Sequence, residues 1–393
     1  MHTAIHHLLL FLLQLLLVPI SPHSLPFTPP TSTTILVTGG AGYIGSHTCL
    51  ELLNAGNTVV IVDNLSNSCE IAVNRLTTLA KLPPNSDNLH FRKVDILNGP
   101  ALDSVCKEFP SITTCVHFAG LKAVGESVAK PLLYYETNVA GTLSLLRTLR
   151  TNNIKNVVFS SSATVYGEPE RLPIDEKCGL SATNPYGNTK LIIEDILRDL
   201  SKSESDWNIL LLRYFNPIGA HPSGAIGEDP KGIPNNLMPF VAQVCVGRRK
   251  KLRVFGNDYD TIDGTGVRDY IHVVDLAKGH VKAVEKLMTS RVGGCTAVNL
   301  GTGTGVSVLE LVKGMEKISG KTVPLEIVER REGDISTCYC DPSKAVRELG
   351  WRAELDLEAM CRDTWKWQSL NPNGYKQEKN QTQNANHLLK KSS

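Results

Sequence analysis

The chain has 393 residues, of which 41% are apolar and 20% are charged. A chain of this length and composition can bury one large core or two unequal ones, which excludes a wholly disordered protein. Lys and Arg total 41 against 39 for Asp and Glu, so the formal charge of +2 provides no basic field for binding nucleic acid regardless of sequence. We therefore expect a small-molecule ligand and no nucleic-acid partner.

The 10 cysteines are spread along the chain, with no Cys-x-x-Cys pair and no histidine cluster at the spacing of metal ligands. This pattern is typical of reduced thiols in a cytosolic protein, and it differs from a disulfide framework or a zinc site. We expect a cytoplasmic protein that holds no metal and makes no stable membrane contact.

The N-terminal segment is the exception, because residues 8–20 form an almost continuous apolar run, followed by a Ser/Pro/Thr-rich stretch. The run resembles the apolar region of a signal peptide, but no Lys or Arg precedes it, and it is too short to span a bilayer. A glycosylation sequon at residues 64–66 lies in the expected cofactor loop, where a glycan would block the site. We expect residues 1–33 to be a cleaved or inert extension, with targeting to the secretory pathway or an organelle as the alternative.

From Thr34 onward, short β-branched runs alternate with longer helical patterns, which is typical of a parallel sheet with crossover helices. The patterns predict strands at residues 35–37, 59–63, 90–94, 114–118, 157–160 and 209–213, and helices at residues 46–53, 132–150 and 185–200. After Arg213, Pro and Gly become frequent and the periodicity weakens, which indicates a second, smaller region. One more contribution to the sheet is expected from residues 271–276 and the helix that follows.

The fold class predicted from these patterns is α/β, with a doubly wound (Rossmann) parallel sheet and a smaller, interleaved substrate domain. The sheet domain is expected over residues 34–213 and 265–291, and the substrate domain over residues 214–264 and 292–376. Residues 377–393 are polar and rich in Asn, Gln and Lys, so a disordered tail is expected there.

A glycine-rich turn joins the first expected strand to the first expected helix, with glycines at positions 39, 42 and 45. Without side chains, the backbone can approach a pyrophosphate, while the helix N-terminus presents free N–H groups to its charge. Asp63 ends the next strand, where a carboxylate accepts hydrogen bonds from both ribose hydroxyls and repels a 2′-phosphate. No Lys or Arg follows within residues 64–68. The unit predicts NAD rather than NADP; the alternative is a structural turn with a solvated Asp.

Tyr186 and Lys190 lie four residues apart, on one face of an expected helix that begins at Asn184–Pro185. A phenol with an ordinary pKa of about 10 must ionise more readily to act as a base, and both a nearby ammonium and the positive end of the helix dipole favour the phenolate. Ser162 ends the serine run 160–162 after an expected strand, where it could donate a hydrogen bond to a reacting oxygen or belong to a solvated turn. With NAD, this set predicts proton removal from an alcohol coupled to hydride loss from its carbon.

The segments at residues 38–47 and 186–190 resemble the extended short-chain dehydrogenase/reductase family. Longer segments resemble the UDP-glucose 4-epimerases within that family, at residues 62–68, 117–127, 160–167, 213–221, 264–275 and 367–375. The resemblance implies that C4 of UDP-glucose or UDP-galactose loses hydride to tightly bound NAD, that the 4-keto sugar rotates, and that hydride returns to its other face. It also implies a homodimer, a role in galactose metabolism, and the N-acetylated UDP-hexoses as candidate further substrates.

The resemblance also implies roles for individual residues. Tyr186 would be the base, Lys190 its electrostatic partner and a ribose contact, and Ser162 the hydroxyl that bridges to the sugar O4. Cofactor contacts are implied for Gly39, Gly42, Tyr43, Ile44, Gly45, Asp63, Asn64, Asn67, Asp95, Ile96, Phe118, Ala119, Gly120, Lys122, Asn138, Tyr186, Lys190 and Tyr214 or Phe215. Substrate contacts are implied for Lys122, Ser162, Tyr186, Asn216, Asn236, Leu237, Arg268, Arg331, Asp334 and Cys338.

Cys338 stands where the family places a residue over the sugar C2 substituent. A Tyr there goes with refusal of N-acetylated sugars and a smaller residue with their acceptance, so Cys338 predicts that UDP-N-acetylglucosamine is a substrate. The alternative is that Cys338 is only a small buried hydrophobic residue.

Three other functions share part of this pattern. A nucleotide-sugar 4,6-dehydratase would place an Asp-Glu pair beside Ser162, whereas this chain has Ala163 and Thr164. A UDP-pentose 4-epimerase is more similar to the pattern of this chain, and it remains an alternative function. A non-enzymatic nucleotide or redox sensor would be free to lose Tyr186 and Lys190, which this chain keeps.

Overall fold

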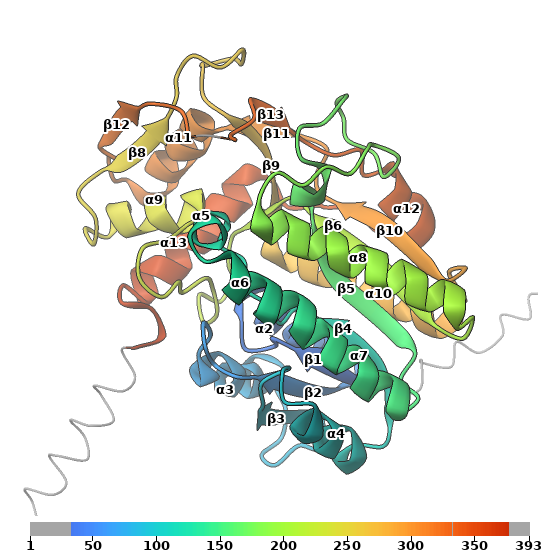
Figure 1. Ribbon diagram of the computed structural model, residues 1–393. Coiled ribbons are helices and arrows are strands. Elements are labelled where there is room, and N and C mark those ends of the chain that lie inside the picture. Colours follow the sequence, from blue (N-terminus) through green and yellow to red (C-terminus); the bar gives the residue numbers. More distant parts are fainter. Residues whose placement is uncertain (1–32, 332, 377–393) are drawn as a thin grey trace, which may run out of the picture. The chain divides into compact units, whose positions relative to one another are not determined.

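The structure is a computed structural model that describes residues 33–331 and 333–376 (Figure 1). The apolar run at residues 8–20 and the expected disordered tail at residues 377–393 lie outside the described residues. None of the helices within the described ranges is long and apolar enough to cross a bilayer.

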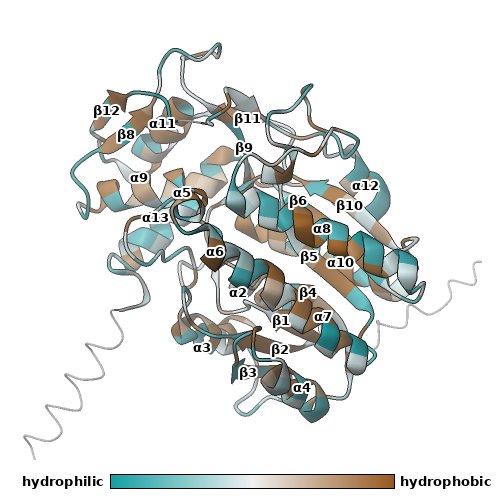
Figure 2. Ribbon diagram, viewed as in Figure 1, coloured by the Kyte–Doolittle hydropathy of each residue, from teal (hydrophilic) through white to brown (hydrophobic). Residues whose placement is uncertain are grey.

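The main sheet consists of seven parallel strands in the order β10-β6-β5-β4-β1-β2-β3. The strands are β1 (Thr34–Thr38), β2 (Thr58–Asp63), β3 (Leu89–Lys93), β4 (Ile112–His117), β5 (Asn156–Ser162), β6 (Asn208–Tyr214) and β10 (Cys295–Leu300). The central strands β5, β4 and β1 are buried almost throughout because a parallel sheet is covered on both faces. The apolar middle of β5 is brown in Figure 2. The predicted doubly wound fold is confirmed, and the first six strands begin and end within two residues of the predicted positions.

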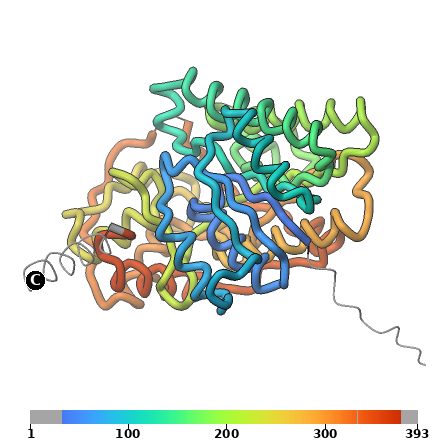
Figure 3. The backbone as a smooth tube through the Cα atoms, turned by 90° about the horizontal axis from the view of Figure 1, so that it is seen from below, coloured from blue at the N-terminus to red at the C-terminus, as the bar shows by residue number. Residues whose placement is uncertain are grey.

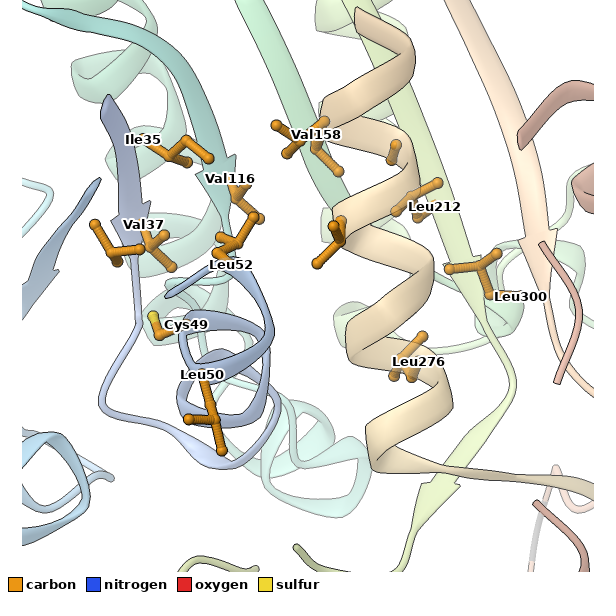
Figure 4. Close-up of a cluster of buried hydrophobic side chains, with 14 of the residues drawn as sticks. Ile35, Val37, Cys49, Leu50, Leu52, Val116, Val158, Leu212, Leu276 and Leu300 are labelled. Atoms are coloured by element: carbon orange, nitrogen blue, oxygen red, sulfur yellow. The ribbon is translucent and has the colours of Figure 1, made fainter. Parts of the chain in front are cut away.

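Helices cover both faces of this sheet. On one face, α2 (Tyr43–Asn54), α3 (Glu70–Leu79) and α10 (Val273–Thr289) enclose a core that includes Cys49, Leu52 and Leu276 (Figure 4). On the other face, α4 (Gly99–Glu108), α7 (Gly141–Thr151) and α8 (Pro185–Ser203) enclose a second core. The green helices α7 and α8 run along one side of the strands in Figure 3.

The helix expected at residues 132–150 is divided. Two short helices, α5 (Val124–Ala129) and α6 (Pro131–Tyr134), lead into a π-helical turn, η1 (Tyr135–Ala140), which continues as α7. A π-turn inserts an extra residue and rotates the side chains of that turn, and such turns are frequent at functional sites. Here the turn contains Asn138, one of the predicted site residues.

One strand prediction is wrong. Residues 271–276 do not join the main sheet, because 267–272 form β9 (Val267–His272) of a second sheet and α10 begins at Val273. The seventh strand is β10, which pairs with β6. The sequence pattern does not predict it, because several of its residues are polar. Asn299 of β10 is nevertheless fully buried, because its amide accepts a hydrogen bond from the Tyr166 hydroxyl (2.6 Å) and donates one to the Ile174 carbonyl (3.0 Å). Together with β10, α12 (Ser343–Leu349) packs on the main sheet's layers, so part of the predicted substrate domain belongs to the sheet domain.

The smaller region continues directly from the carboxyl edge of the main sheet, since β7 (Asn216–Ile218) begins two residues after β6 ends. In the second sheet, β9 pairs with β7, β11 (Gly305–Ser307) and β13 (Thr337–Cys338). The smaller region also contains a separate two-stranded sheet of β8 (Leu252–Phe255) and β12 (Leu325–Val328), and the helices α9 (Leu237–Cys245), α11 (Val308–Ser319), α13 (Leu357–Leu370) and η3 (Gly374–Lys376). A short 3₁₀ helix, η2 (Ala163–Tyr166), follows β5. This topology places the smaller region over the carboxyl ends of the parallel strands, where open α/β sheets bind ligands.

Candidate active site

The turn between β1 and α2 forms a cradle that only glycine permits. Gly39 has φ +72°, and a Cβ atom there would lie 2.7 Å from the Ala119 nitrogen. A Cβ atom on Gly45 would lie 2.3 Å from the Gly39 carbonyl oxygen. Among the described residues, none caps the start of α2 with a side chain, and its first turn holds no acid, so its N–H groups remain available to an anion. The cradle therefore fits a pyrophosphate.

Asp63 organises the loop after β2. Its carboxylate accepts hydrogen bonds from the backbone nitrogen of Ala41 (3.1 Å) in the cradle, and from the nitrogen of Leu65 (2.9 Å) and the hydroxyl of Ser68 (2.7 Å) in its own loop. Leu65 adopts the left-handed region with φ 60°, which is unusual for a side chain of this kind. Asp63 thus joins the cradle to the loop in addition to any contact with a ribose.

Two further predicted cofactor residues meet beside this loop. The amide nitrogen of Asn64 donates to the Asp95 carboxylate (2.8 Å), which joins the ends of β2 and β3. Asn67 is exposed on the loop, and Ile96 is buried in the core beneath it.

Lys231 is a residue at this loop that the local sequence does not reveal. Its ammonium group donates to the carbonyl oxygens of Leu65 (2.9 Å) and Ser66 (2.6 Å), although 166 and 165 positions separate them in the chain. The prediction that no cation follows Asp63 is correct for residues 64–68, but the fold brings a lysine to the same loop from the smaller region.

Asn138 holds the loop after β4, which contains Phe118, Ala119, Gly120 and Lys122. Its amide oxygen accepts from the Leu121 nitrogen (2.7 Å), and its amide nitrogen donates to the Leu121 carbonyl (3.0 Å) and to the hydroxyl of Thr189 on α8 (3.0 Å). Both polar atoms of this buried side chain therefore bind protein atoms. In this arrangement Asn138 holds the loop after β4 in place, and the cofactor contact that the resemblance implies for it stays a prediction.

The predicted catalytic set is brought together at the carboxyl end of β5. Ser162 is the last residue of that strand, and its hydroxyl accepts hydrogen bonds from the Thr164 nitrogen (3.2 Å) and the Thr164 hydroxyl (3.0 Å), while it also interacts with the phenol of Tyr186. Tyr186 lies in the first turn of α8, which Asn184 caps by accepting a hydrogen bond from the Gly187 nitrogen (2.9 Å). The Lys190 ammonium lies 5.9 Å from the centroid of the Tyr186 ring.

The protonation of this set differs from the sequence-based expectation. Burial raises the pKa of Tyr186 above its ordinary value, although the hydrogen bond with Ser162 opposes this. Burial also lowers the pKa of Lys190 to about 8, against the attraction of Glu194 one turn later. The ammonium is directed at the Ser160 carbonyl, to which it donates at 2.7 Å, and not at the phenol. In the protein without ligand, the loss of solvation therefore affects the pKa of Tyr186 more than the charge of Lys190 does.

A buried ion pair lies next to the predicted catalytic set and connects the elements that carry it. Arg213 on β6 donates to both carboxylate oxygens of Glu194 on α8 (2.9 and 2.6 Å), and the Ser161 hydroxyl on β5 donates to the same carboxylate (2.5 Å). These contacts tie together the three elements that carry or flank Ser162, Tyr186 and Lys190. The spacing of Glu194, four residues after Lys190 on the same helical face, is a signal that could have identified it.

Apart from Lys122, Ser162 and Tyr186, the predicted substrate residues lie in the smaller region. Asn216 begins β7, Asn236 and Leu237 begin α9, and Arg268 in β9 is in register with Cys338 in β13. The guanidinium of Arg331 donates to the Asp334 carboxylate (2.9 Å) and lies 4.7 Å from the centroid of the Phe255 ring. Arginine in such a position suits bidentate recognition of phosphate.

Glu228 is another site residue that the sequence does not single out. Its carboxylate accepts hydrogen bonds from Lys122 (2.9 Å) and from Asn236 (3.1 Å), and so connects a predicted cofactor residue with a predicted substrate residue. Among the aromatic residues nearby, Tyr43 donates its hydroxyl to the Gly219 carbonyl (2.7 Å) and lies 5.7 Å from the Lys122 ammonium.

Cys338 and Phe215 pack in one small buried cluster with Tyr166 and Cys340. Cys338 is 9% exposed, and burial raises the pKa of its thiol to about 11, so it behaves as a small apolar side chain. Tyr214 is buried on the other face of the sheet, where its hydroxyl is hydrogen-bonded to His280. Its packing there favours Phe215 as the one of the pair that faces the site.

Comparison with known proteins agrees with this geometry. Residues 36–364 match the family described as GDP-mannose 4,6 dehydratase. The chain is 61% identical over 342 residues to a UDP-glucose 4-epimerase of Bacillus subtilis (strain 168), covering 87% of this chain and 98% of that protein.

Solved structures agree as well. The structure of UDP-glucose 4-epimerase from Bifidobacterium longum in complex with NAD+ and UDP has a TM-score of 0.83 and 52% identity, covering 87% of this chain and 100% of that one. UDP-glucose-4-epimerase from Stenotrophomonas maltophila with bound NAD and formylated UDP-arabinopyranose has a TM-score of 0.83 and 48% identity, covering 86% and 99%. The glycine cradle, the clustered Ser162, Tyr186 and Lys190, and these similarities together show that the chain belongs to the UDP-glucose 4-epimerase family of extended short-chain dehydrogenases/reductases.

Proposed function

We propose that the chain interconverts UDP-glucose and UDP-galactose by inverting C4 of the sugar through a 4-keto intermediate, in galactose metabolism. The observation that carries this proposal is the placement of Tyr186 and Ser162 together at the carboxyl end of β5, on the same edge of the sheet as the glycine cradle that follows β1. A phenolate held there can remove the proton of the sugar 4-hydroxyl, and the Ser162 hydroxyl can orient the same oxygen. Return of that proton to the oxygen and of a hydride to C4 would complete the cycle without net oxidation of the sugar.

NAD is the cofactor that these residues fit. The cradle and the start of α2 would hold its pyrophosphate, Asp63 its adenosine ribose, and Lys190 its other ribose. When bound, NAD supplies a reversible hydride acceptor. The positive charge that Lys190 carries near Tyr186 favours the phenolate once the surrounding protein and ligand hold both groups in place.

The direct test measures nucleotide and activity together. Denatured protein should release NAD, identified by mass spectrometry, and the native protein should interconvert UDP-glucose and UDP-galactose. Tyr186→Phe should lower turnover by about 10³-fold or more while NAD stays bound, because only the proton acceptor is lost. Tyr135→Phe is the matched control, since it removes a phenol oxygen from η1, outside the set. A Tyr186→Phe variant with a tenth of the normal rate would refute the assignment of the base.

The substrate range is proposed to depend on the side chain of Cys338 and on the predicted diphosphate residues. A nucleotide diphosphate fits Asn236, Arg268 and Arg331, whichever sugar follows. A UDP-pentose therefore remains an alternative substrate, and the small side chain of Cys338 favours acceptance of N-acetylated UDP-hexoses. Rates on UDP-glucose, UDP-N-acetylglucosamine and a UDP-pentose, measured side by side, distinguish these possibilities.

A homodimer is proposed from exposed apolar side chains on adjacent helices. Val128 on α5, Leu132 on α6 and Ile192 on α8 are 63%, 80% and 37% exposed, and brown positions gather on α5 and α6 in Figure 2. Large apolar patches of this kind mark interaction sites. Leu132→Asp should convert the dimer to a monomer in sedimentation equilibrium, whereas Ile262→Asp, at an 85% exposed apolar residue in the smaller region, should not. A wild-type monomer would contradict the proposal.

A cytoplasmic location is proposed from the cysteines. All of them lie within the described residues as free thiols, and most are buried, as in proteins of a reducing compartment. Imaging of a fluorescent fusion that retains residues 1–33 tests this, and a signal confined to an organelle would contradict it.

A further inference from the structure

Residues 227–236, here named the strap, link the smaller region to the cofactor crevice. Hydrogen bonds to residues near the C-terminal end of the described chain hold the strap in place. The Trp367 indole donates to the Glu228 carbonyl (3.1 Å), and the Gly227 nitrogen donates to the Tyr375 hydroxyl (3.2 Å). The Tyr375 nitrogen in turn donates to the Asp229 carboxylate (3.0 Å). These anchors use largely backbone atoms of the strap, so its side chains can reach elsewhere.

Two of those side chains reach opposite walls of the crevice. Strand β1 lies between β4 and β2, so the loops that follow β4 and β2 flank the glycine cradle on its two sides. Lys231 donates to the carbonyls of Leu65 and Ser66 in the loop after β2. Glu228 accepts from Lys122 in the loop after β4. A single short segment therefore bridges both walls at the point where the sheet order reverses and dinucleotides bind.

Each of these two contacts restrains a group that is otherwise held weakly: the strained backbone at Leu65 and the exposed side chain of Lys122. Leu65 has a left-handed backbone, which is strained for a residue with a side chain, and the Lys231 ammonium donates to its carbonyl oxygen. At the other wall, the Glu228 side chain is 11% exposed and the Lys122 side chain 51% exposed. The Glu228 carboxylate is thus the less exposed partner, and it holds the ammonium of the more exposed Lys122.

We propose that the strap closes the cofactor crevice and slows release of NAD, with Lys231 and Glu228 as the positioning residues that hold it shut. Neither residue needs to touch the nucleotide for this, because each holds a loop that the nucleotide must displace to leave. The inference rests on the proposed use of NAD and adds the structural element that controls its retention.

The test measures how fast bound NAD exchanges with deuterium-labelled NAD, by mass spectrometry of the nucleotide that stays with the protein after rapid desalting. Lys231→Gln removes an exposed ammonium with two hydrogen bonds and should speed exchange about tenfold. Lys231→Arg keeps the charge and the donors and should exchange nearly as slowly as the wild type. Lys250→Gln, at an exposed lysine of the same region, is the matched control.

Glu228→Gln keeps the shape of the side chain and removes its charge, so exchange should be several-fold faster than in the wild type. If both residues hold one strap, the double variant should exchange more slowly than the product of the two single effects predicts. Multiplicative effects, or wild-type exchange in both single variants, would overturn the proposal. Absence of NAD from wild-type protein would instead overturn the proposed function, so the two failures are distinguishable.

Discussion

Lys190→Met should make the protein more stable at neutral pH while it impairs catalysis. Lys190 is 6% exposed, and burial lowers its pKa from the ordinary 10.5 to about 8. At about 1.36 kcal/mol per pKa unit, this difference corresponds to about 3 kcal/mol of stability lost when the folded protein must hold the charged form. The hydrogen bond to the Ser160 carbonyl contributes about 1 kcal/mol in return. The variant should therefore gain about 2 kcal/mol at pH 7.

The pH dependence provides a sharper test of the same reasoning. Because the pKa is lower in the folded state, the unfolded chain binds more protons between pH 8 and 10.5, and stability must rise with pH in that window. Between pH 7 and pH 10 the wild type should gain about 2.5 kcal/mol relative to Lys190→Met. Every other titrating group is common to both proteins, so the difference isolates Lys190.

Urea unfolding of NAD-free protein, followed by circular dichroism at pH 7 and pH 10, measures this difference. Removing NAD from both proteins matters because a bound ligand would stabilise the one that holds it better. Lys250→Met, at an exposed lysine, should show the wild-type pH dependence. Equal pH dependence of the wild type and Lys190→Met would refute the reasoning, because it would mean that burial does not penalise the charge.

The Lys190→Met variant should also change catalysis, and three further predictions concern other residues. Lys190→Met should also raise the pH optimum of turnover and weaken NAD retention, because the phenolate loses its cationic neighbour; an unchanged pH–rate profile would contradict this. Asp63→Ala should loosen NAD and let NADP compete, measured as the ratio of the two nucleotides bound from an equal mixture; equal binding already in the wild type would show that Asp63 does not discriminate. A chain that starts at Ser32 should be soluble and fully active, because β1 begins at Thr34, and an inactive product would mean that the apolar segment is required. Cys338→Tyr should abolish activity on UDP-N-acetylglucosamine and spare UDP-glucose, by overpacking the pocket at one substituent; wild-type inactivity on the N-acetylated sugar would assign pocket size to another residue.

The sequence by itself determined the parts of this protein whose physics is local. The strand, glycine turn and helix at residues 34–54 are adjacent in the chain, and each has a composition that few other structures tolerate. The helix start at Asn184–Pro185 likewise determines that Tyr186 lies in the first turn and Lys190 one turn later. Ser162 could be predicted because parallel strands end at the same edge of the sheet, so a polar residue at a strand end points to the site.

Only the tertiary structure decided the features that depend on distant residues or on burial. β10 carries the polar residue Asn299, which can be buried because Tyr166 and Ile174 form hydrogen bonds with its amide group. No pattern along the chain shows that these residues are its partners. Lys231 reaches the Asp63 loop across more than 160 positions, so a search of the residues after Asp63 could not find it. The pKa of the Tyr186 phenol differs from the sequence-based expectation for a related reason, because burial raises it although a nearby ammonium and the helix dipole are expected to favour the phenolate. Charge and helix position are visible in the sequence, whereas loss of solvation, which is the larger effect here, depends on everything that packs around the group.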